Sequence, residues 1–195
     1  MPVIVRIFGN PTKPQTIVTS TIKGSPTTVW NVVTNAPETS DMIGDPDSMA
    51  LDPAGELVLD NRSDDSLYIV RGPGAAKRVL RIPLTLSGIP VEVNDTIFTI
   101  SATTGAASTA GVVYITDTTA NQIYSLTKPY FPSGEVYTAA NVVGDVGLVD
   151  LNTGIVTPVA TGFAGVHGLA FSPTAVAIKA PESEADGDGL AVESP

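Results

Sequence analysis

Few residues in this chain could carry acid–base chemistry. His167, within Gly165-Val166-His167-Gly168-Leu169, is the only histidine, and the sequence contains no cysteine. Disulfides, thiol catalysis and sulfur-ligated metals are therefore excluded, and any catalytic triad would have to use His167. The histidine is either a ligand-binding group or general base, or a turn residue whose imidazole is satisfied locally. The sequence favours the turn residue and predicts no catalytic group.

A second candidate is a short run of oxygen donors between two apolar segments. Asp60, Asn61, Asp64 and Asp65 fall within six positions, and carboxylate and amide oxygens are the ligands that Ca²⁺ prefers. The spacing lacks the glycine at position six and the terminal glutamate of an EF-hand loop. Asp186-Gly187-Asp188-Gly189 is similarly incomplete. Both runs are either calcium sites or solvated turns, and we expect turns and no cofactor.

Aromatic side chains form the third candidate. Tyr130, Phe131 and Tyr137 lie close together around Lys128-Pro129 and Pro132. On an exposed, proline-rich insertion they would contact a glycan or a peptide, together with His167. Alternatively they cap the apolar core. Trp30, on an alternating segment, is predicted to lie in the core.

Alternating apolar and polar residues predict the elements that position these groups. The segments are rich in Val, Ile, Thr and Tyr, which favour strands. They recur in pairs joined by Asp, Asn and Gly turns: 56–61 with 66–70, 111–117 with 121–126, and 146–151 with 155–159. No long amphipathic helix is visible, and 18 glycines and 16 prolines interrupt most helical patterns. The sequence predicts an all-β protein.

One segment returns much later in the chain. Ser48-Met49-Ala50-Leu51-Asp52-Pro53 recurs as Gly168-Leu169-Ala170-Phe171-Ser172-Pro173, an offset of 120 residues (168 less 48). Three periods of about 40 residues fit that offset, and such a period is typical of a four-stranded propeller blade.

The sequence pattern of the repeat resembles the repeats of the NHL and SMP-30-like six-bladed β-propellers. The likeness covers residues 42–173 and rests on Ala-Leu-Asp-Pro-Ala-Gly-Glu-Leu-Val-Leu-Asp-Asn followed by Ser-Leu-Tyr-Ile-Val, with 146–173 similar to a further blade. The resemblance implies blades around a channel, with His167 on a loop near it. SMP-30-like hydrolases hold a metal there with a Glu, an Asn and an Asp, and no such set can be placed in this chain.

The length conflicts with a complete ring of that kind. Six blades need about 250 residues, and this chain has 195. Three alternatives remain: a four-bladed ring, an open arc completed by another copy, and a β-sandwich whose sequence only resembles the repeat. An open arc exposes sheet edges and apolar faces, so self-association or a neighbouring subunit is expected.

The chain is expected to divide into three parts. Residues 1–35 form an arm with leading strands at 16–21 and 27–34, and residues 36–179 form the repeat β domain after a loop at 36–48. A last strand is expected at 174–179, before an acidic tail at 180–195. That tail is too poor in apolar residues to fold alone.

Charge and hydropathy narrow the partners and the location. The net charge of −10, with 20 acids against 10 bases, disfavours binding to nucleic acid phosphates. No run is long enough to span a membrane, and the N-terminus shows no signal peptide. We expect an extracellular or virion location, with a cytoplasmic stage before assembly.

Three functions remain after these exclusions. The favoured hypothesis is a non-catalytic structural or interaction protein that is a subunit of a larger assembly, such as a virion or an extracellular layer. The second is a secreted, propeller-like module that binds a glycan or a peptide. The third is a propeller hydrolase or lyase that acts through a metal or His167. We predict that the protein is not an enzyme.

Overall fold

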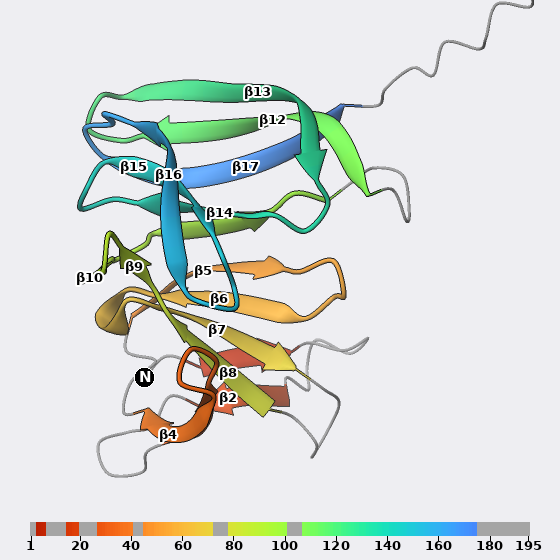
Figure 1. Cartoon of the computed structure of the whole chain (residues 1–195), viewed down its shortest axis with the longest axis vertical. Coiled ribbons are helices and arrows are strands. Elements are labelled where there is room, and N and C mark those ends of the chain that lie inside the picture. The colour runs from red at the N-terminus through yellow and green to blue at the C-terminus, as the bar shows by residue number, and fades with distance from the viewer. Residues whose placement is uncertain are drawn as a thin grey trace, which may run out of the picture.

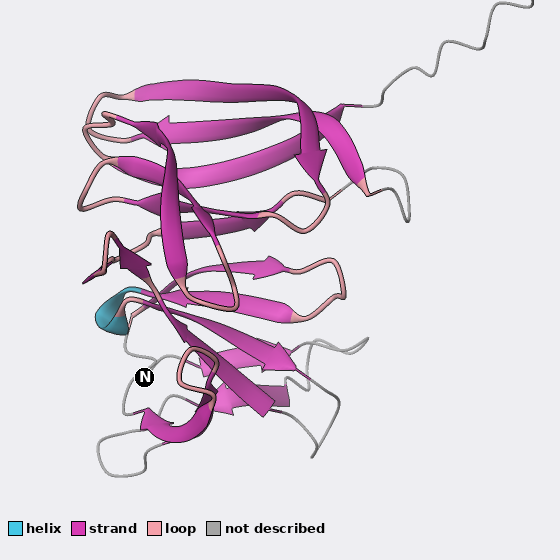
Figure 2. Ribbon diagram, viewed as in Figure 1, coloured by secondary structure: helices cyan, strands magenta, loops and turns pink. Residues whose placement is uncertain are grey.

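The protein is all-β, as the sequence predicts. The computed structural model describes residues 3–6, 15–19, 27–40, 45–71, 78–100 and 107–174. Within these ranges the only helical element is a single 3-10 turn, η1 (Arg62–Asp64), and every sheet is open (Figures 1 and 2). No helix in the described ranges is long and apolar enough to cross a membrane.

Sheet I contains six strands and includes both sides of the expected boundary at residue 35. Its order is β4 (Ala36–Ser40), β3 (Thr27–Asn31), β8 (Arg78–Pro83), β7 (Ser66–Arg71), β6 (Leu57–Asn61) and β5 (Pro46–Leu51). β5 to β8 form an antiparallel meander, and β3 joins β8 in parallel. β3, within the strand expected at 27–34, thus shares a sheet with strands from residues 36–83.

Sheet II has six strands, and sheet III has three. Sheet II runs β10 (Ile89–Pro90), β9 (Thr85–Leu86), β16 (Ile155–Thr161), β15 (Asp145–Val149), β14 (Val136–Ala140) and β11 (Asp95–Phe98). Sheet III runs β13 (Gln122–Pro132), β12 (Ser108–Asp117) and β17 (Val166–Thr174). A separate pair, β1 (Val3–Arg6) and β2 (Gln15–Thr19), includes part of the strand expected at 16–21. The expected strand at 174–179, beyond Thr174, and the acidic tail lie outside the described residues.

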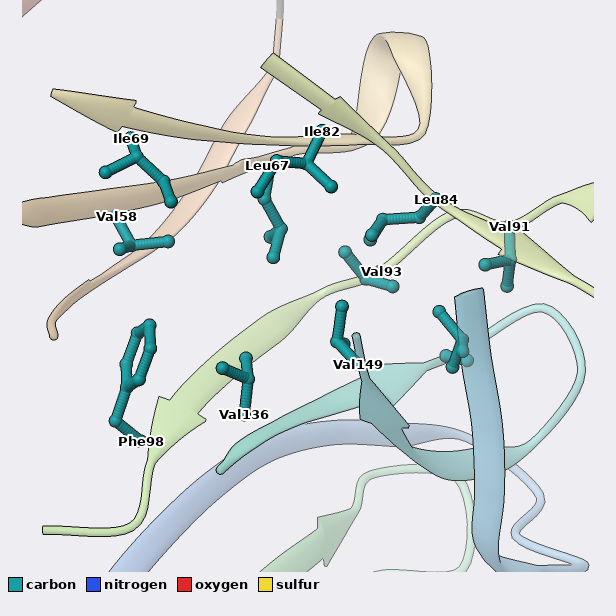
Figure 3. Packing of buried hydrophobic residues seen from close by; sticks show 12 residues of the cluster. Val58, Leu67, Ile69, Ile82, Leu84, Val91, Val93, Phe98, Val136 and Val149 are labelled. Atoms are coloured by element: carbon teal, nitrogen blue, oxygen red, sulfur yellow. The ribbon is translucent and has the colours of Figure 1, made fainter. Parts of the chain in front are cut away.

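Sheet II is the middle layer of the molecule. One core cluster joins Val58, Leu67 and Ile82 of sheet I to residues of sheet II such as Phe98 and Val136, as Figure 3 shows. A second cluster lies on the opposite face, where Tyr137 and Ala139 of β14 pack against Val113, Ile115 and Leu169 of sheet III. All five residues of β14 are buried because successive side chains enter different cores.

The 120-residue repeat has a structural counterpart. β5 and β17 each pair with a strand that ends in a polar residue pair, Asp60-Asn61 in β6 and Thr116-Asp117 in β12. Ser48 N donates to Asp60 Oδ1, and Gly168 N donates to Thr116 Oγ1 at the matching place. The next residues repeat the match, with Asp45 N bound to Asn61 Oδ1 and Ala164 N bound to Asp117 Oδ2.

The repeat units are nevertheless not consecutive in space. β17 pairs with β12, which precedes it by about fifty residues, whereas β5 pairs with the strand that follows it. The segment 146–173 is therefore divided, with β15 and β16 in sheet II and β17 in sheet III. A similar local sequence identifies strands that form the same kind of hydrogen bond, but it does not identify the strands with which they pair.

The Asn152-Thr153-Gly154 turn shows how local and tertiary requirements coincide. Asp150 caps it by accepting from Asn152 N at 2.9 Å and from Thr153 Oγ1 at 2.8 Å. Gly154 has φ +71°, and a Cβ there would collide with the carbonyl oxygen of Pro83 in sheet I. A glycine is thus required both for the backbone conformation and for the approach of two sheets.

Candidate functional site

Asp60 is a buried carboxylate that connects two sheets. It lies at the end of β6 with an exposed fraction of 1%. Its two oxygens accept from Ser48 N at 2.5 Å and from Ser48 Oγ at 2.7 Å. Ser48 Oγ also accepts from Thr96 N of sheet II at 3.2 Å. Burial raises the pKa of Asp60 to about 6, the bonds from Ser48 oppose this shift, and the nearby acids Asp95 and Asp47 add to it.

A similar bond connects sheets II and III. Asp95 in β11 accepts from Leu169 N of β17 at 2.6 Å, and Thr138 Oγ1 donates to the Asp95 carbonyl at 2.9 Å. Ser48 of β5, Asp60 of β6 and Asp95 of β11 thus form a polar seam, in which hydrogen bonds join β5 to β6 and to β11, and β11 to β17. We interpret this polar seam as a structural connection between the layers.

The turn that follows β6 contains or is stabilised by Asn61, Asp64 and Asp65. Asn61 Nδ2 donates to Asp64 Oδ1 at 2.5 Å, and Tyr68 OH and Arg81 Nε donate to Asp64 Oδ2 at 2.5 and 3.0 Å. Asp65 ends the turn in the left-handed region at φ 51°. Burial raises the pKa of Asp65, with Glu92 and Asp64 adding to the shift and Arg81 opposing it.

These four oxygen-bearing residues do not converge on one point. Asp60 binds Ser48, and Asp64 is engaged by Tyr68 and Arg81. Within the ranges that the structure covers, no group of three or more carboxylates and imidazoles is arranged to hold a metal ion. The run Asp186–Gly189 lies outside those ranges. The described geometry thus offers no support for a calcium site at residues 60–65.

The three aromatic candidates have different environments. Phe131 and Tyr137 are fully buried, with their ring centroids 6.0 Å apart, whereas Tyr130 is 59% exposed. Tyr137 OH donates to Glu135 at 2.8 Å and accepts from Lys128 Nζ at 3.1 Å. Burial and the bond to Glu135 raise the pKa of Tyr137. Of the three, only Tyr130 is available to a ligand.

Two further predictions from the sequence, for residues 128–132 and for Trp30, differ from the structure. Residues 128–132 continue β13 as a strand instead of forming a loop. A register shift against β12 in this segment places the Phe131 side chain in the core. Trp30 is 40% exposed, and Val29 beside it is the buried residue. The alternation of that strand is shifted by one residue from the predicted core position.

His167 is exposed near the start of β17, where the register against β12 shifts. The backbone on its C-terminal side is fixed by Gly168 N, which donates to Thr116 Oγ1 at 2.7 Å. Among the described residues, no hydrogen bond to its imidazole is found. In the described part of the chain, no hydrogen bond or ion pair joins His167 to a nucleophile or a carboxylate.

The outward face of sheet III is a regular, uncharged surface. Burial alternates along β12, where Val113 and Ile115 face sheet II and Tyr114 is 45% exposed on the other side. The strand register places Ser125 and Ala170 beside Tyr114, and Ile123 beside Thr116. We call this set the outer face; it consists of Val112, Tyr114, Thr116, Ile123, Ser125, Thr127, Ala170 and Ser172.

The outer face was not identified from the sequence, although part of its signal is visible there. The ten residues 118–127 contain no charged side chain. The alternation of 111–117 also places Tyr114 opposite the core phase of Val113 and Ile115. What the sequence lacks is the pairing of β17 with β12, which completes the face.

Comparison of the chain with protein-family models, curated proteins and solved structures finds no match. The likeness to the NHL and SMP-30-like propellers accordingly remains an expectation that rests on the motifs alone. What the structure establishes is an all-β protein of three stacked open sheets.

Proposed function

We propose that this protein is a non-catalytic structural subunit that associates with copies of itself through sheet III. The observation that carries the proposal is the outer face, an exposed strand surface without a charged residue on a chain of net charge −10. A virion or an extracellular layer is the kind of assembly that such a subunit would build.

Electrostatics supports a second copy as the partner. Acidic molecules repel one another, and the repulsion is least where neither contact surface contains carboxylates. Interface cores are depleted in charged residues and enriched in tyrosine. The outer face has both properties, with Tyr114 at its centre between Ser125 and Ala170.

The layering of the molecule supports the same conclusion. Sheet II is covered on one face by sheet I and on the other by sheet III. Sheet III is covered by sheet II on its inner face. On its other face Tyr114, Ile123 and Ser125 are exposed. Another sheet packed on the outer face would give sheet III the environment that sheet II has.

A charge placed on the outer face should weaken association. Tyr114→Glu adds a carboxylate at the centre of the face, and burying it would require desolvation without a partner. We expect the mass measured by light scattering to exceed one chain for the wild type, with dissociation at least about tenfold easier in the variant.

Ile89→Glu is the matched control, because Ile89 is 69% exposed on β10 of sheet II. This variant should associate as the wild type does. Equal association of both variants and the wild type would show that the outer face is not the contact.

A binding module is the second candidate, favoured by one specific observation. Of the five tyrosines, Tyr114, Tyr124 and Tyr130 are at least partly exposed and all lie on sheet III. Exposed tyrosines on a strand surface offer flat apolar contact to a sugar ring or a peptide.

On this second hypothesis, Tyr130→Ala is expected to weaken any glycan or peptide that binds on an array, while leaving the mass in solution unchanged. Trp30→Ala, an aromatic truncation on sheet I, is the control and should leave such binding intact. An unchanged array signal in Tyr130→Ala would remove the support for this role.

A further inference from the structure

The edges of the three large sheets differ in how they are protected. β11 contacts both β5 and β17, so the inner edges of the three sheets cover one another. At the outer edges, β4 contains Pro37 and Glu38, and β10 has only two residues, one of them Pro90. Proline, charge and short length are the common means by which proteins prevent edge strands from pairing with other chains.

β13 has none of this protection along its first six residues. It is the edge strand of sheet III, eleven residues long, and lies at the top of Figure 1 with β12 on one side only. Gln122-Ile123-Tyr124-Ser125-Leu126-Thr127 contains no proline, glycine or charge. Backbone N–H and C=O groups on the side away from β12 form no hydrogen bond among the described residues.

The nearest charged residue does not protect this edge. Lys128 Nζ lies 5.3 Å from the Phe131 ring centroid and 5.4 Å from that of Tyr137. It also donates to Tyr137 OH, so its charge is held against the core side of sheet III. Pro129 and Pro132 limit further pairing to the segment before them.

We propose that the free edge of β13 pairs antiparallel with β13 of a second copy, which joins two copies of sheet III into one six-stranded sheet. A strand edge recognises another strand, and the uncharged segment avoids opposing carboxylates between two acidic copies. This inference rests on the proposed assembly role and adds a second contact to it. A two-fold edge contact and a face contact together can build more than a dimer.

The alternation of side chains restricts the register. Residues opposite each other in an antiparallel pair lie on the same face, so a two-fold axis perpendicular to the sheet places one residue opposite its own copy. With Ser125 at the axis, Tyr124 lies opposite Leu126 of the second copy, and Ile123 lies opposite Thr127. Aromatic–aliphatic and β-branched pairs of this kind stabilise a sheet.

The absence of cysteine allows a direct test of this register. In Ser125→Cys the two new thiols would face each other across the axis, and facing Cα atoms in an antiparallel pair are about 4.5 to 5.5 Å apart, within the range of a disulfide. Ser172→Cys is the control, because Ser172 is exposed on the same outer face but on β17. Under mild oxidation we expect covalent dimers of Ser125→Cys to form at least about tenfold faster than those of Ser172→Cys.

A double variant separates the edge contact from the face contact. Ser125→Cys combined with Tyr114→Glu should still crosslink, because the edge does not depend on the face. If the wild type is larger than one chain and Ser125→Cys crosslinks no faster than Ser172→Cys, the edge pairing is wrong while the assembly role stands. If the wild type has the mass of one chain at every concentration, both proposals fail.

Discussion

At about pH 7.5 the Asp60→Asn variant is expected to be more stable than the wild type by about 2 to 3 kcal/mol. Asp60 is buried, and its pKa is raised from 3.8 to about 6. Each pKa unit corresponds to about 1.4 kcal/mol, so this shift of about two units means that keeping the carboxylate ionised costs the folded state about 3 kcal/mol. Asparagine has nearly the same shape and remains neutral.

The pH dependence follows from the direction of the shift. Between about pH 4 and pH 6 the folded protein retains a proton on Asp60 that the unfolded chain has lost, so the unfolding free energy falls as the pH rises. Above pH 6 both states are ionised, and this contribution is constant. The stability difference between Asp60→Asn and the wild type should therefore grow from near zero below pH 4 to its full value above pH 6.

Urea unfolding of both proteins at several pH values measures this difference. Asp52→Asn is the matched control: Asp52 accepts from Ala54 N and Glu56 N in a hairpin turn, so its replacement should be destabilising at neutral pH. An Asp60→Asn variant that is less stable than the wild type at every pH would contradict the account of the polar seam.

Phe131→Ala is expected to destabilise the protein by about 3 to 5 kcal/mol, the usual cost of truncating a buried phenylalanine. Its ring is fully buried and packs edge-to-face against Phe171, at a centroid distance of 5.2 Å, and against Tyr137. Removal would leave a cavity between sheets II and III that these rigid strands cannot close.

Tyr130→Ala is the control beside it, since Tyr130 is 59% exposed. Its effect on the unfolding free energy should be within about 0.5 kcal/mol. Thermal and urea unfolding of the two variants would distinguish a core residue from a surface residue. Similar small effects for both would mean that Phe131 is not packed as described.

The strands of this protein were largely predictable from the sequence because their signals are local. The predicted segment 111–117 lies within β12, and the turn at Asn152-Thr153-Gly154 separates β15 from β16 as expected. β4 falls within the loop expected at 36–48. It forms because Asn31 Oδ1 accepts from Val33 N and Thr34 N, which closes a tight hairpin onto β3.

The candidate site depended on information that local patterns do not contain. Phe131 enters the core through a register shift, and Asp60 is buried because Ser48 satisfies it from a neighbouring strand. The outer face exists only because β17 pairs with β12 across about fifty residues. When similar strand sequences recur along a chain, each strand has several equivalent strands with which it could pair. Three-dimensional packing then decides which strands pair.

The most direct test of the assembly role is the molar mass of the wild-type protein, measured by light scattering over a wide dilution series. One chain has a mass of 20.0 kDa. We predict a mass of at least two chains at high concentration that falls toward one chain on dilution, because the contacts of sheet III are reversible. A mass of 20.0 kDa at every concentration would contradict the proposal.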